Sequence, residues 1–214
     1  MTDAPDRMLV FGGSFDPPHR AHVELPRLVA DQLDCDVTLY IPAKISPHKL
    51  DAPPTAAEHR LRMLELALAA CERTAISTIE LQRDGPSYTA DTLVQLNQRY
   101  PDTTQLFLLI GADHALGFHR WHAWQRILEH AEPAVMLRPP WDRAAFESAL
   151  DATYDDDEAA AWRRRIVDTP SIDISATELR DRLRLGRDVG DWLHPDVQDY
   201  IRRHDLYRDP PPAT

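Results

Sequence analysis

Short apolar runs alternate with longer amphipathic runs along most of the chain. The apolar runs predict buried β-strands, and they lie at residues 8–11, 37–41, 75–81, 106–110, 134–137 and 165–168. The amphipathic runs predict helices, at residues 23–33, 56–71, 89–100, 124–130, 144–161, 176–185 and 195–204. Because strands and helices alternate, the pattern predicts an α/β fold with a mainly parallel sheet. No internal repeat and no long linker interrupts it.

Residue types at the ends of these runs predict where the helices begin. Ser87 or Thr89 is suited to cap the helix that ends near residue 100. Ser175 is suited to cap the helix that follows it, with Glu178 at the capping-box position. The acidic residues 151–158 interrupt a helical run and predict a solvated loop or a helix start.

The helix predicted at residues 56–71 has a broad apolar face. Leu61, Met63, Leu64 and Leu68 share that face and are expected to be buried. The segment that precedes it, residues 43–54, is polar and contains proline, so a long loop is expected there. The proline-rich residues 210–214 are expected to form a frayed tail.

The most informative stretch runs from Phe11 to His22 and reads FGGSFDPPHRAH. It joins a predicted strand to a predicted helix, the arrangement with which α/β folds hold a phosphate. Gly12 and Gly13 lack a Cβ, which is expected to let the backbone turn sharply and approach a ligand. His19 and His22 are three residues apart in the first helical turn and share one face. The stretch predicts an anion site with two imidazoles, while a surface turn or half of a zinc site remain the alternatives.

Two separated motifs resemble the signatures of the nucleotidyltransferase superfamily. G-G-S-F-D-P-P-H-R-A-H resembles its first signature, G-G-[ST]-F-D-P-x-H-x-G-H, and I-S-A-T-E-L-R at residues 174–180 resembles its second, I-S-[SA]-T-x-x-R. Three further segments resemble bacterial nicotinate-nucleotide adenylyltransferases: P-S-Y-T-A-D-T-L at residues 86–93, G-A-D at 111–113, and the tail L-H-P-D-V at 193–197, which runs on to Ile201 and to L-Y-R at 206–208. The matches occur in the family's order and cover nearly the whole chain.

This resemblance implies a fold and an activity. The implied fold is a Rossmann-like, doubly wound, mainly parallel sheet with helices on both faces and a small C-terminal helical part at about residues 175–208. It implies a single nucleotidyltransferase domain over residues 1–214. The implied activity is transfer of AMP from ATP to nicotinate mononucleotide, which gives deamido-NAD and pyrophosphate in NAD biosynthesis.

The resemblance also implies roles for individual residues. The implied catalytic residues are His19, His22 and Arg180. The implied ATP-binding residues are Gly12, Gly13, Ser14, Phe15, His19, His22, Ser175, Thr177 and Arg180. The implied acceptor-binding residues are Lys44, Thr89, Asp113, Trp121 and His122. Among these, Trp121 stacks on the nicotinate ring, the backbone N–H groups of Thr89 and His122 hold its carboxylate, and Asp113 lies on the sugar side.

Magnesium is expected to arrive with ATP, because Mg²⁺ keeps several waters and binds mainly through substrate phosphates. No metal site made of protein ligands is predicted. His114, His119 and His122 have a spacing that matches no common ligand set. Trp124, near the implied acceptor residues, is expected to serve core packing.

Two positions depart from the family pattern. Ala21 stands where glycine is usual and adds one methyl group near the phosphates. Lys44 stands where asparagine is usual, in the segment I-P-A-K-I-S-P-H-K at residues 41–49. Its ammonium group could pair with an acceptor phosphate or carboxylate, or extend into solvent, and the sequence leaves both open.

Composition narrows the classes of partner. The formal net charge of −11 disfavours a nucleic-acid-binding protein, which needs a basic face. No run of about 18 apolar residues predicts a membrane span, and the polar residues 1–7 do not resemble a signal peptide. Cys35 and Cys71 are expected to be free thiols. We therefore expect a cytoplasmic protein without a membrane or nucleic-acid partner, and the question of a homo-oligomer is left open.

Two other kinds of function remain. One is a sister adenylyltransferase with nicotinamide mononucleotide or phosphopantetheine as acceptor, and the P-S-Y-T-A segment disfavours it. The other is a nucleotide-binding sensor without catalysis, which the intact His19, His22, Ser175 and Arg180 disfavour.

Overall fold

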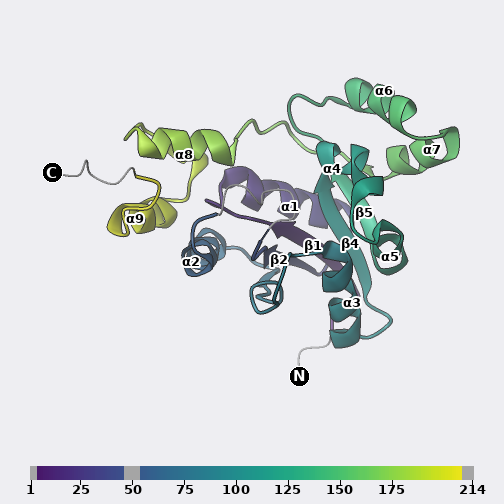
Figure 1. Ribbon diagram of the computed structural model, residues 1–214, viewed down its shortest axis with the longest axis horizontal. Coiled ribbons are helices and arrows are strands. Elements are labelled where there is room, and N and C mark those ends of the chain that lie inside the picture. The colour runs from purple at the N-terminus through teal and green to yellow at the C-terminus, as the bar shows by residue number, and fades with distance from the viewer. Residues whose placement is uncertain (1–3, 46–53, 209–214) are drawn as a thin grey trace.

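A single parallel sheet forms the centre of the molecule (Figure 1). The computed structural model describes residues 4–45 and 54–208. Its six strands lie in the order β3-β2-β1-β4-β5-β6, and all their pairings are parallel. The strands are β1 (Arg7–Gly13), β2 (Val37–Pro42), β3 (Thr74–Ile76), β4 (Gln105–Gly111), β5 (Glu132–Met136) and β6 (Ile166–Val167). Strands β2 and β3 lie on one side of β1, and the chain then returns to form β4 on its other side. The order of strands therefore reverses between β1 and β4, and a crevice is expected at the carboxyl ends of these two strands.

Helices cover both faces of this sheet. They are α1 (Arg20–Gln32), α2 (Ala57–Leu68), α3 (Thr89–Arg99), α4 (Ala112–Leu116), α5 (Trp124–His130), α6 (Arg143–Thr153), α7 (Asp156–Arg164), α8 (Ala176–Arg184) and α9 (Pro195–Arg203), with short 3₁₀ helices η1 (Phe118–Arg120) and η2 (Gly190–Trp192). Successive strand residues point to opposite faces. Leu9 and Phe11 of β1 therefore pack with α1 and α2, whereas Met8 and Val10 pack with helices α3 to α7. The predicted α/β class, with a parallel sheet and helices on both faces, is confirmed.

The C-terminal helices α8 and α9 attach to α2 rather than to the sheet (Figure 1). Met63 and Ala67 of α2 pack against Leu179 of α8 and against Val197 and Ile201 of α9. Helix α2 thus has one side on the sheet and another on this C-terminal part. The small C-terminal helical part is present where the family resemblance implied it.

One predicted strand has the wrong extent, whereas the predicted interruption of a helical run is confirmed. Strand β3 ends at Ile76 rather than near residue 81, because the chain turns after it, although Ile79 still packs in the core. The helical run predicted at residues 144–161 is divided in two at its acidic interruption, where Tyr154 has an extended backbone. Asp155 then accepts a hydrogen bond from the Glu158 N–H at 2.9 Å and begins α7, so the acidic run is a helix start.

The predicted side-chain caps are also wrong. Ser175 occupies the N-cap position of α8 but makes no capping hydrogen bond, and Glu178 pairs with Arg182 at 3.0 Å instead. Tyr88, rather than Ser87 or Thr89, precedes the first turn of α3. Glu178 is thus paired within α8, and the Ser87 hydroxyl accepts a hydrogen bond from the backbone N–H of Lys44 instead of capping α3.

The outcomes of the remaining sequence predictions can be stated briefly. The segment at residues 46–49 of the family-like loop and the predicted tail at 210–214 lie outside the described residues. Cys35 and Cys71 are both free thiols. No helix within residues 4–45 and 54–208 combines the length and the apolar character that a membrane crossing requires.

Candidate active site

The first motif lies at the carboxyl end of the central strand β1, in the loop that follows, and in the first turn of α1. The prediction that its glycines supply the sharp turn is wrong, because neither Gly12 nor Gly13 has a positive φ. Phe15 adopts the left-handed conformation instead, with φ 48°. Its buried ring lies beside Gly13, where a Cβ would come within 3.1 Å of the ring. The missing side chain of Gly13 therefore makes room for Phe15.

His19 and His22 form a stacked pair at the start of α1. Their ring centroids are 3.6 Å apart with an interplanar angle of 23°. The backbone N–H of His19 donates to Nδ1 of His22 at 3.3 Å, so a neutral His22 carries its proton on Nε2. The pair thus presents imidazole nitrogens at a helix N-terminus, where backbone N–H groups favour an anion.

Burial holds His19 in its neutral form. Only 5% of its surface is exposed, and this burial, together with the charge of Arg138, lowers its pKa from 6.5 to about 4. Its Nδ1 is buried and has no hydrogen-bond partner among the described residues. Since a buried polar atom without a partner is costly, a ligand that reached it would be stabilised.

A buried polar network fixes the loop between β1 and α1. Asp16 is 5% exposed, and its two carboxylate oxygens accept hydrogen bonds from the Thr55 N–H at 3.1 Å and the Tyr207 hydroxyl at 2.6 Å. The guanidinium of Arg60 is also buried and donates to the carbonyls of Ser14 and Thr55, both at 2.8 Å. Burial lowers the pKa of Arg60, and the charge of Asp16 opposes that shift. The loop is therefore held on both sides by side chains from distant segments.

Sequence reasoning missed this network. It assigned the buried face of α2 to Leu61, Met63, Leu64 and Leu68, and the last three are buried. Leu61 is only half-buried, and Arg60 takes the inner position. The available signal was an arginine three and four residues before Met63 and Leu64, on the face that the periodicity marked as apolar.

The second motif reaches the first through Arg180. Its Nη1 donates to the carbonyl of Asp16 at 2.8 Å, and its Nη2 donates to Oγ1 of Thr177 at 3.2 Å. Residues 164 positions apart in the chain thus meet beside the loop before α1. Ser175 and Thr177 are exposed at the start of α8. The structure therefore brings the segments of His19, His22, Thr177 and Arg180 to one region.

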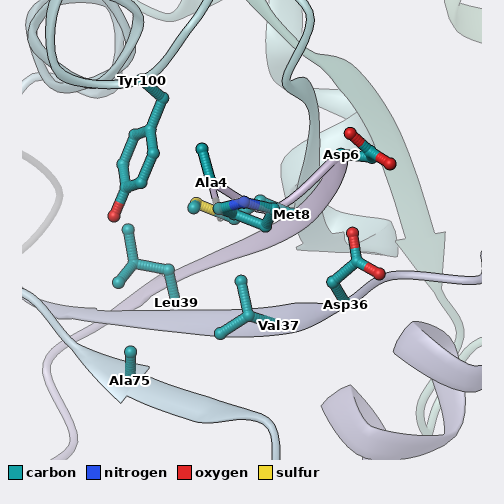
Figure 2. A pocket seen from close by; sticks show the side chains of 9 residues that line it. Ala4, Asp6, Met8, Asp36, Val37, Leu39, Ala75 and Tyr100 are labelled. Carbon is teal, nitrogen blue, oxygen red and sulfur yellow. The ribbon is translucent and has the colours of Figure 1, made fainter. Parts of the chain in front are cut away.

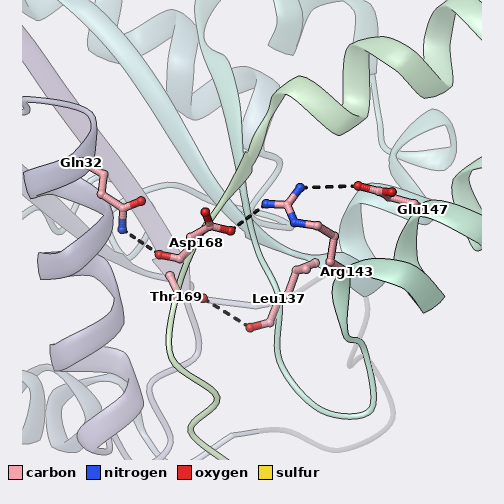
Figure 3. A network of polar contacts seen from close by, with 6 residues as sticks. All are labelled: Gln32, Leu137, Arg143, Glu147, Asp168 and Thr169. Atoms are coloured by element: carbon pink, nitrogen blue, oxygen red, sulfur yellow. Dashed lines mark hydrogen bonds and ion pairs between the residues drawn. The ribbon is translucent and has the colours of Figure 1, made fainter.

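The segment that leads into the second motif is anchored where it leaves the sheet (Figure 3). The Asp168 carbonyl accepts from Nε2 of Gln32 in α1 at 2.7 Å, and its carboxylate pairs with Arg143 of α6 at 2.7 Å. Thr169 donates to the Leu137 carbonyl at 3.4 Å. These contacts fix the path from β6 toward α8.

A second group of predicted residues lies at the ends of β4 and β5. Asp113 follows β4 and accepts from Nε1 of Trp141 at 2.7 Å and from Arg138 at 3.4 Å. The Arg138 side chain passes over Gly111, where a Cβ would lie 3.8 Å from its Nε. Since its charge also acts on His19, Arg138 links the two groups of residues. Sequence reasoning missed Arg138, although a cation directly after a parallel strand was a usable signal.

The aromatic residues near Asp113 meet the start of α3. The rings of His122 and Tyr88 are 4.3 Å apart, which brings the segment of His122 close to Thr89, the first residue of α3. Trp121 is half-buried and stacks on Phe118 at 5.3 Å between centroids. The structure thus brings Thr89, Trp121 and His122 together. Trp124 packs against the core, as predicted.

Lys44 is bound to the protein itself. Its ammonium group donates to the carbonyl of Arg83 at 2.9 Å and pairs with Asp84 at 3.3 Å. Its backbone N–H donates to Oγ of Ser87 at 3.0 Å. The side chain therefore ties the end of β2 to the loop before α3, and its pairing with an acceptor phosphate or carboxylate stays a prediction.

A cavity of about 530 Å³ lies at the opposite edge of the sheet, at the amino ends of the strands (Figure 2). Met8, Val37 and Tyr100 are among the residues that line it, and its charged lining residues, Asp6 and Asp36, are both acidic. None of the predicted site residues lines it. An acidic rim disfavours phosphates, so the carboxyl edge remains the candidate site.

Comparisons with known proteins show which family the chain resembles. The model of the cytidylyltransferase-like family matches residues 10–182. A protein of Chromobacterium violaceum named "Probable nicotinate-nucleotide adenylyltransferase" is 38% identical over 209 residues, which cover 94% of this chain and 99% of the relative. One of the same name from Thermomicrobium roseum is 37% identical, covering 94% of this chain and 92% of the relative.

A solved structure is similar in fold. It is the Plasmodium falciparum nicotinic acid mononucleotide adenylyltransferase complexed with NaAD, with a TM-score of 0.69. The match covers 94% of this chain and 97% of the other, at 19% sequence identity. The likeness extends over the sheet and its helices, so the arrangement described above is that of an established fold.

Proposed function

Because the chain belongs to the cytidylyltransferase-like family, among the nicotinate-nucleotide adenylyltransferases, we propose that it transfers AMP from ATP to nicotinate mononucleotide. A phosphate oxygen of nicotinate mononucleotide attacks the α-phosphorus of ATP. A new P–O bond forms, the bond between the α-phosphorus and the bridging oxygen breaks, and pyrophosphate leaves with that oxygen. The products are deamido-NAD and pyrophosphate.

This reaction asks the protein mainly to align two anions and to stabilise charge. The attacking phosphate is already anionic, so no strong base is needed, and alignment alone can contribute roughly 7–11 kcal/mol in favourable cases. The single observation that carries the proposal is the contact between Arg180 and the Asp16 carbonyl at 2.8 Å, because it places both motifs around one region. A helix N-terminus, two imidazoles and a guanidinium there suit a triphosphate.

We assign the ATP phosphates to the two motifs. His19 and His22 would donate to the phosphate at which substitution occurs, and Gly12, Gly13, Ser14 and Phe15 form the loop beside it. Arg180, with Ser175 and Thr177, would hold the two phosphates that leave as pyrophosphate. The support is the unpartnered Nδ1 of His19 and the position of Arg180 beside the first motif.

We assign Mg²⁺ to the substrate. Two carboxylates of the proposed site are engaged, since Asp16 is bound to Thr55 and Tyr207, and Asp113 to Trp141 and Arg138. Imidazole nitrogens suit softer metals than Mg²⁺. The ion would therefore be held by phosphate oxygens and water, where it neutralises negative charge on ATP.

The acceptor is proposed to lie between α3 and the segment of Trp121. The indole would stack on the pyridine ring, which adds roughly 0.5–1.5 kcal/mol beyond its buried area. Backbone N–H groups at Thr89 and His122 would bind the nicotinate carboxylate, and Asp113 would face the sugar. The contact between Tyr88 and His122 supports this arrangement, because it holds the two donor segments side by side. Lys44 would act on this site only through the loop that it binds.

The cellular setting remains part of the proposal. Two free thiols suit a reducing compartment, and we propose the cytoplasm. The proposal involves no nucleic acid and leaves open whether two chains associate.

Steady-state kinetics test the proposed function. Purified protein is incubated with ATP and Mg²⁺, and pyrophosphate release is measured with nicotinate mononucleotide, nicotinamide mononucleotide or phosphopantetheine as acceptor. We expect kcat/KM to be at least about 100-fold higher for nicotinate mononucleotide, because an amide presents a donor to a donor at the carboxylate site. Equal values for the two mononucleotides would refute the acceptor assignment. Absence of pyrophosphate with every acceptor would refute adenylyl transfer.

A further inference from the structure

Among the described residues that hydrogen-bond to the loop between β1 and α1, Tyr207 is the farthest along the chain from that loop. It follows α9, near the end of the described chain, and its hydroxyl donates to Oδ1 of Asp16 at 2.6 Å. This separation of 191 residues is larger than that between the two motifs. A contact of this kind connects the C-terminal segment directly to the proposed ATP site.

The backbone of Tyr207 is held in an unusual conformation. Its φ of 64° lies in the left-handed region, which bulky residues rarely adopt. Such a conformation persists only where surrounding contacts outweigh the strain. Burial and the charge of Asp16 raise the pKa of the Tyr207 hydroxyl, so at neutral pH it remains a donor to the carboxylate.

Asp16 transmits this contact to Arg180. Its carboxylate accepts two hydrogen bonds, one at Oδ1 from the Tyr207 hydroxyl and one at Oδ2 from the Thr55 N–H. With both oxygens held, the residue has one orientation, and its carbonyl accepts from Nη1 of Arg180 at 2.8 Å. The position of the guanidinium therefore depends on the orientation of Asp16.

We propose that Tyr207 is a positioning residue for the pyrophosphate end of ATP, acting through Asp16 on Arg180. This inference rests on the proposed function only in naming ATP as the ligand. The hydroxyl does not contact the substrate. It fixes the carboxylate of Asp16, and thereby keeps the guanidinium at the distance that phosphate binding requires.

Tyr207→Phe tests the proposal, because it removes the hydroxyl and keeps the ring. Hydrogen bonds to charged groups are strong enough that we expect kcat/KM for ATP to fall about tenfold, whereas KM for the mononucleotide changes less than twofold. Tyr200→Phe is the matched control, since the Tyr200 hydroxyl contacts Nδ1 of His59 at 2.8 Å, rather than Asp16. The thermal unfolding of both variants is measured to check that they are folded at the assay temperature.

A double-mutant cycle tests the route of the effect. If Tyr207 acts through Arg180, then Tyr207→Phe causes little further loss of kcat/KM in an Arg180→Lys background. Independent, additive losses would overturn the route through Arg180. Wild-type ATP kinetics in Tyr207→Phe, or an equal loss for both substrates, would overturn the positioning role.

Binding of a non-hydrolysable ATP analogue, measured by calorimetry, keeps this test separate from the proposed function. If the wild-type protein binds the analogue but makes no product, the proposed function fails, and the effect of Tyr207→Phe on analogue affinity still decides the positioning role. Affinity weakened about tenfold supports it, and unchanged affinity overturns it.

Discussion

The buried His19 is expected to make the stability of the protein depend on pH. In the unfolded chain its pKa is 6.5, and in the folded protein burial and the charge of Arg138 lower it to about 4. Between these two values the unfolded state binds more protons than the folded state, so the free energy of unfolding falls as the pH falls. The contribution is fully present above about pH 6.5 and fully lost below about pH 4.

The magnitude follows from the size of the shift. At 1.36 kcal/mol per pKa unit, the displacement from 6.5 to about 4 corresponds to about 3 kcal/mol when the loss is complete. Between pH 7 and pH 5 the same two values give a loss of about 2 kcal/mol. Against a typical total stability of about 5–15 kcal/mol, this loss is large enough to measure.

Urea denaturation at pH 7 and pH 5 provides the assay, with wild type and His19→Asn compared. Asparagine is a good N-cap residue and keeps the start of α1, while it removes the titrating group. We expect the variant to lose about 2 kcal/mol less than wild type over this interval. His204→Asn, at the exposed end of α9, should behave as wild type. If wild type and His19→Asn lose the same amount, the reasoning on burial is refuted.

The remaining predictions concern the proposed reaction. His22→Ala should lower kcat by about 10²–10³-fold, as loss of one charge-stabilising donor typically does, and a near-normal kcat/KM would exclude this role. Arg180→Lys should impair ATP use, because lysine lacks the planar fork that binds phosphate; ATP saturation kinetics at wild-type values would contradict it. Trp121→Ala should raise KM for both mononucleotides and leave KM for ATP within about twofold, since stacking does not sense the carboxylate. Lys44→Asn should raise KM for nicotinate mononucleotide through the loop at residues 83–87 and leave that for ATP unchanged, and a shift in the ATP value alone would refute this link.

Much of the fold could be predicted from the sequence because the residues of its four central strands are mostly buried. The apolar run at residues 106–110 needs no information beyond itself, and β4 extends it by one residue at each end. Element boundaries were less predictable where tertiary contacts decide them. The backbone of Tyr154 divides one predicted helix, and its hydroxyl donates to the distant carbonyl of Ala115 at 2.6 Å, a contact that no local pattern indicates.

The candidate site was predictable in its motifs and not in its supports. His19, His22 and Arg180 lie in recognisable motifs, and the structure brings their segments together. The local pattern around Arg60 shows only a helix, and the family-like tail around Tyr207 indicates no role for that residue. Their importance comes from burial beside Asp16, and burial of a polar side chain is a property of the folded packing. Lys44 shows the same limit, because its partner is a backbone carbonyl, which is present at every position in the sequence.

The contact between Arg180 and the carbonyl of Asp16 also sets an order of events during synthesis. Proteins emerge from the ribosome beginning with the N-terminus, and the last strand of the sheet ends at Val167, before Arg180 has been made. A nascent chain that has all six strands and the H-x-x-H pair would therefore still lack Arg180, and the proposed nucleotide site would be incomplete. On the proposed function, the nascent chain would acquire activity only after the last helices, α8 and α9, have been made.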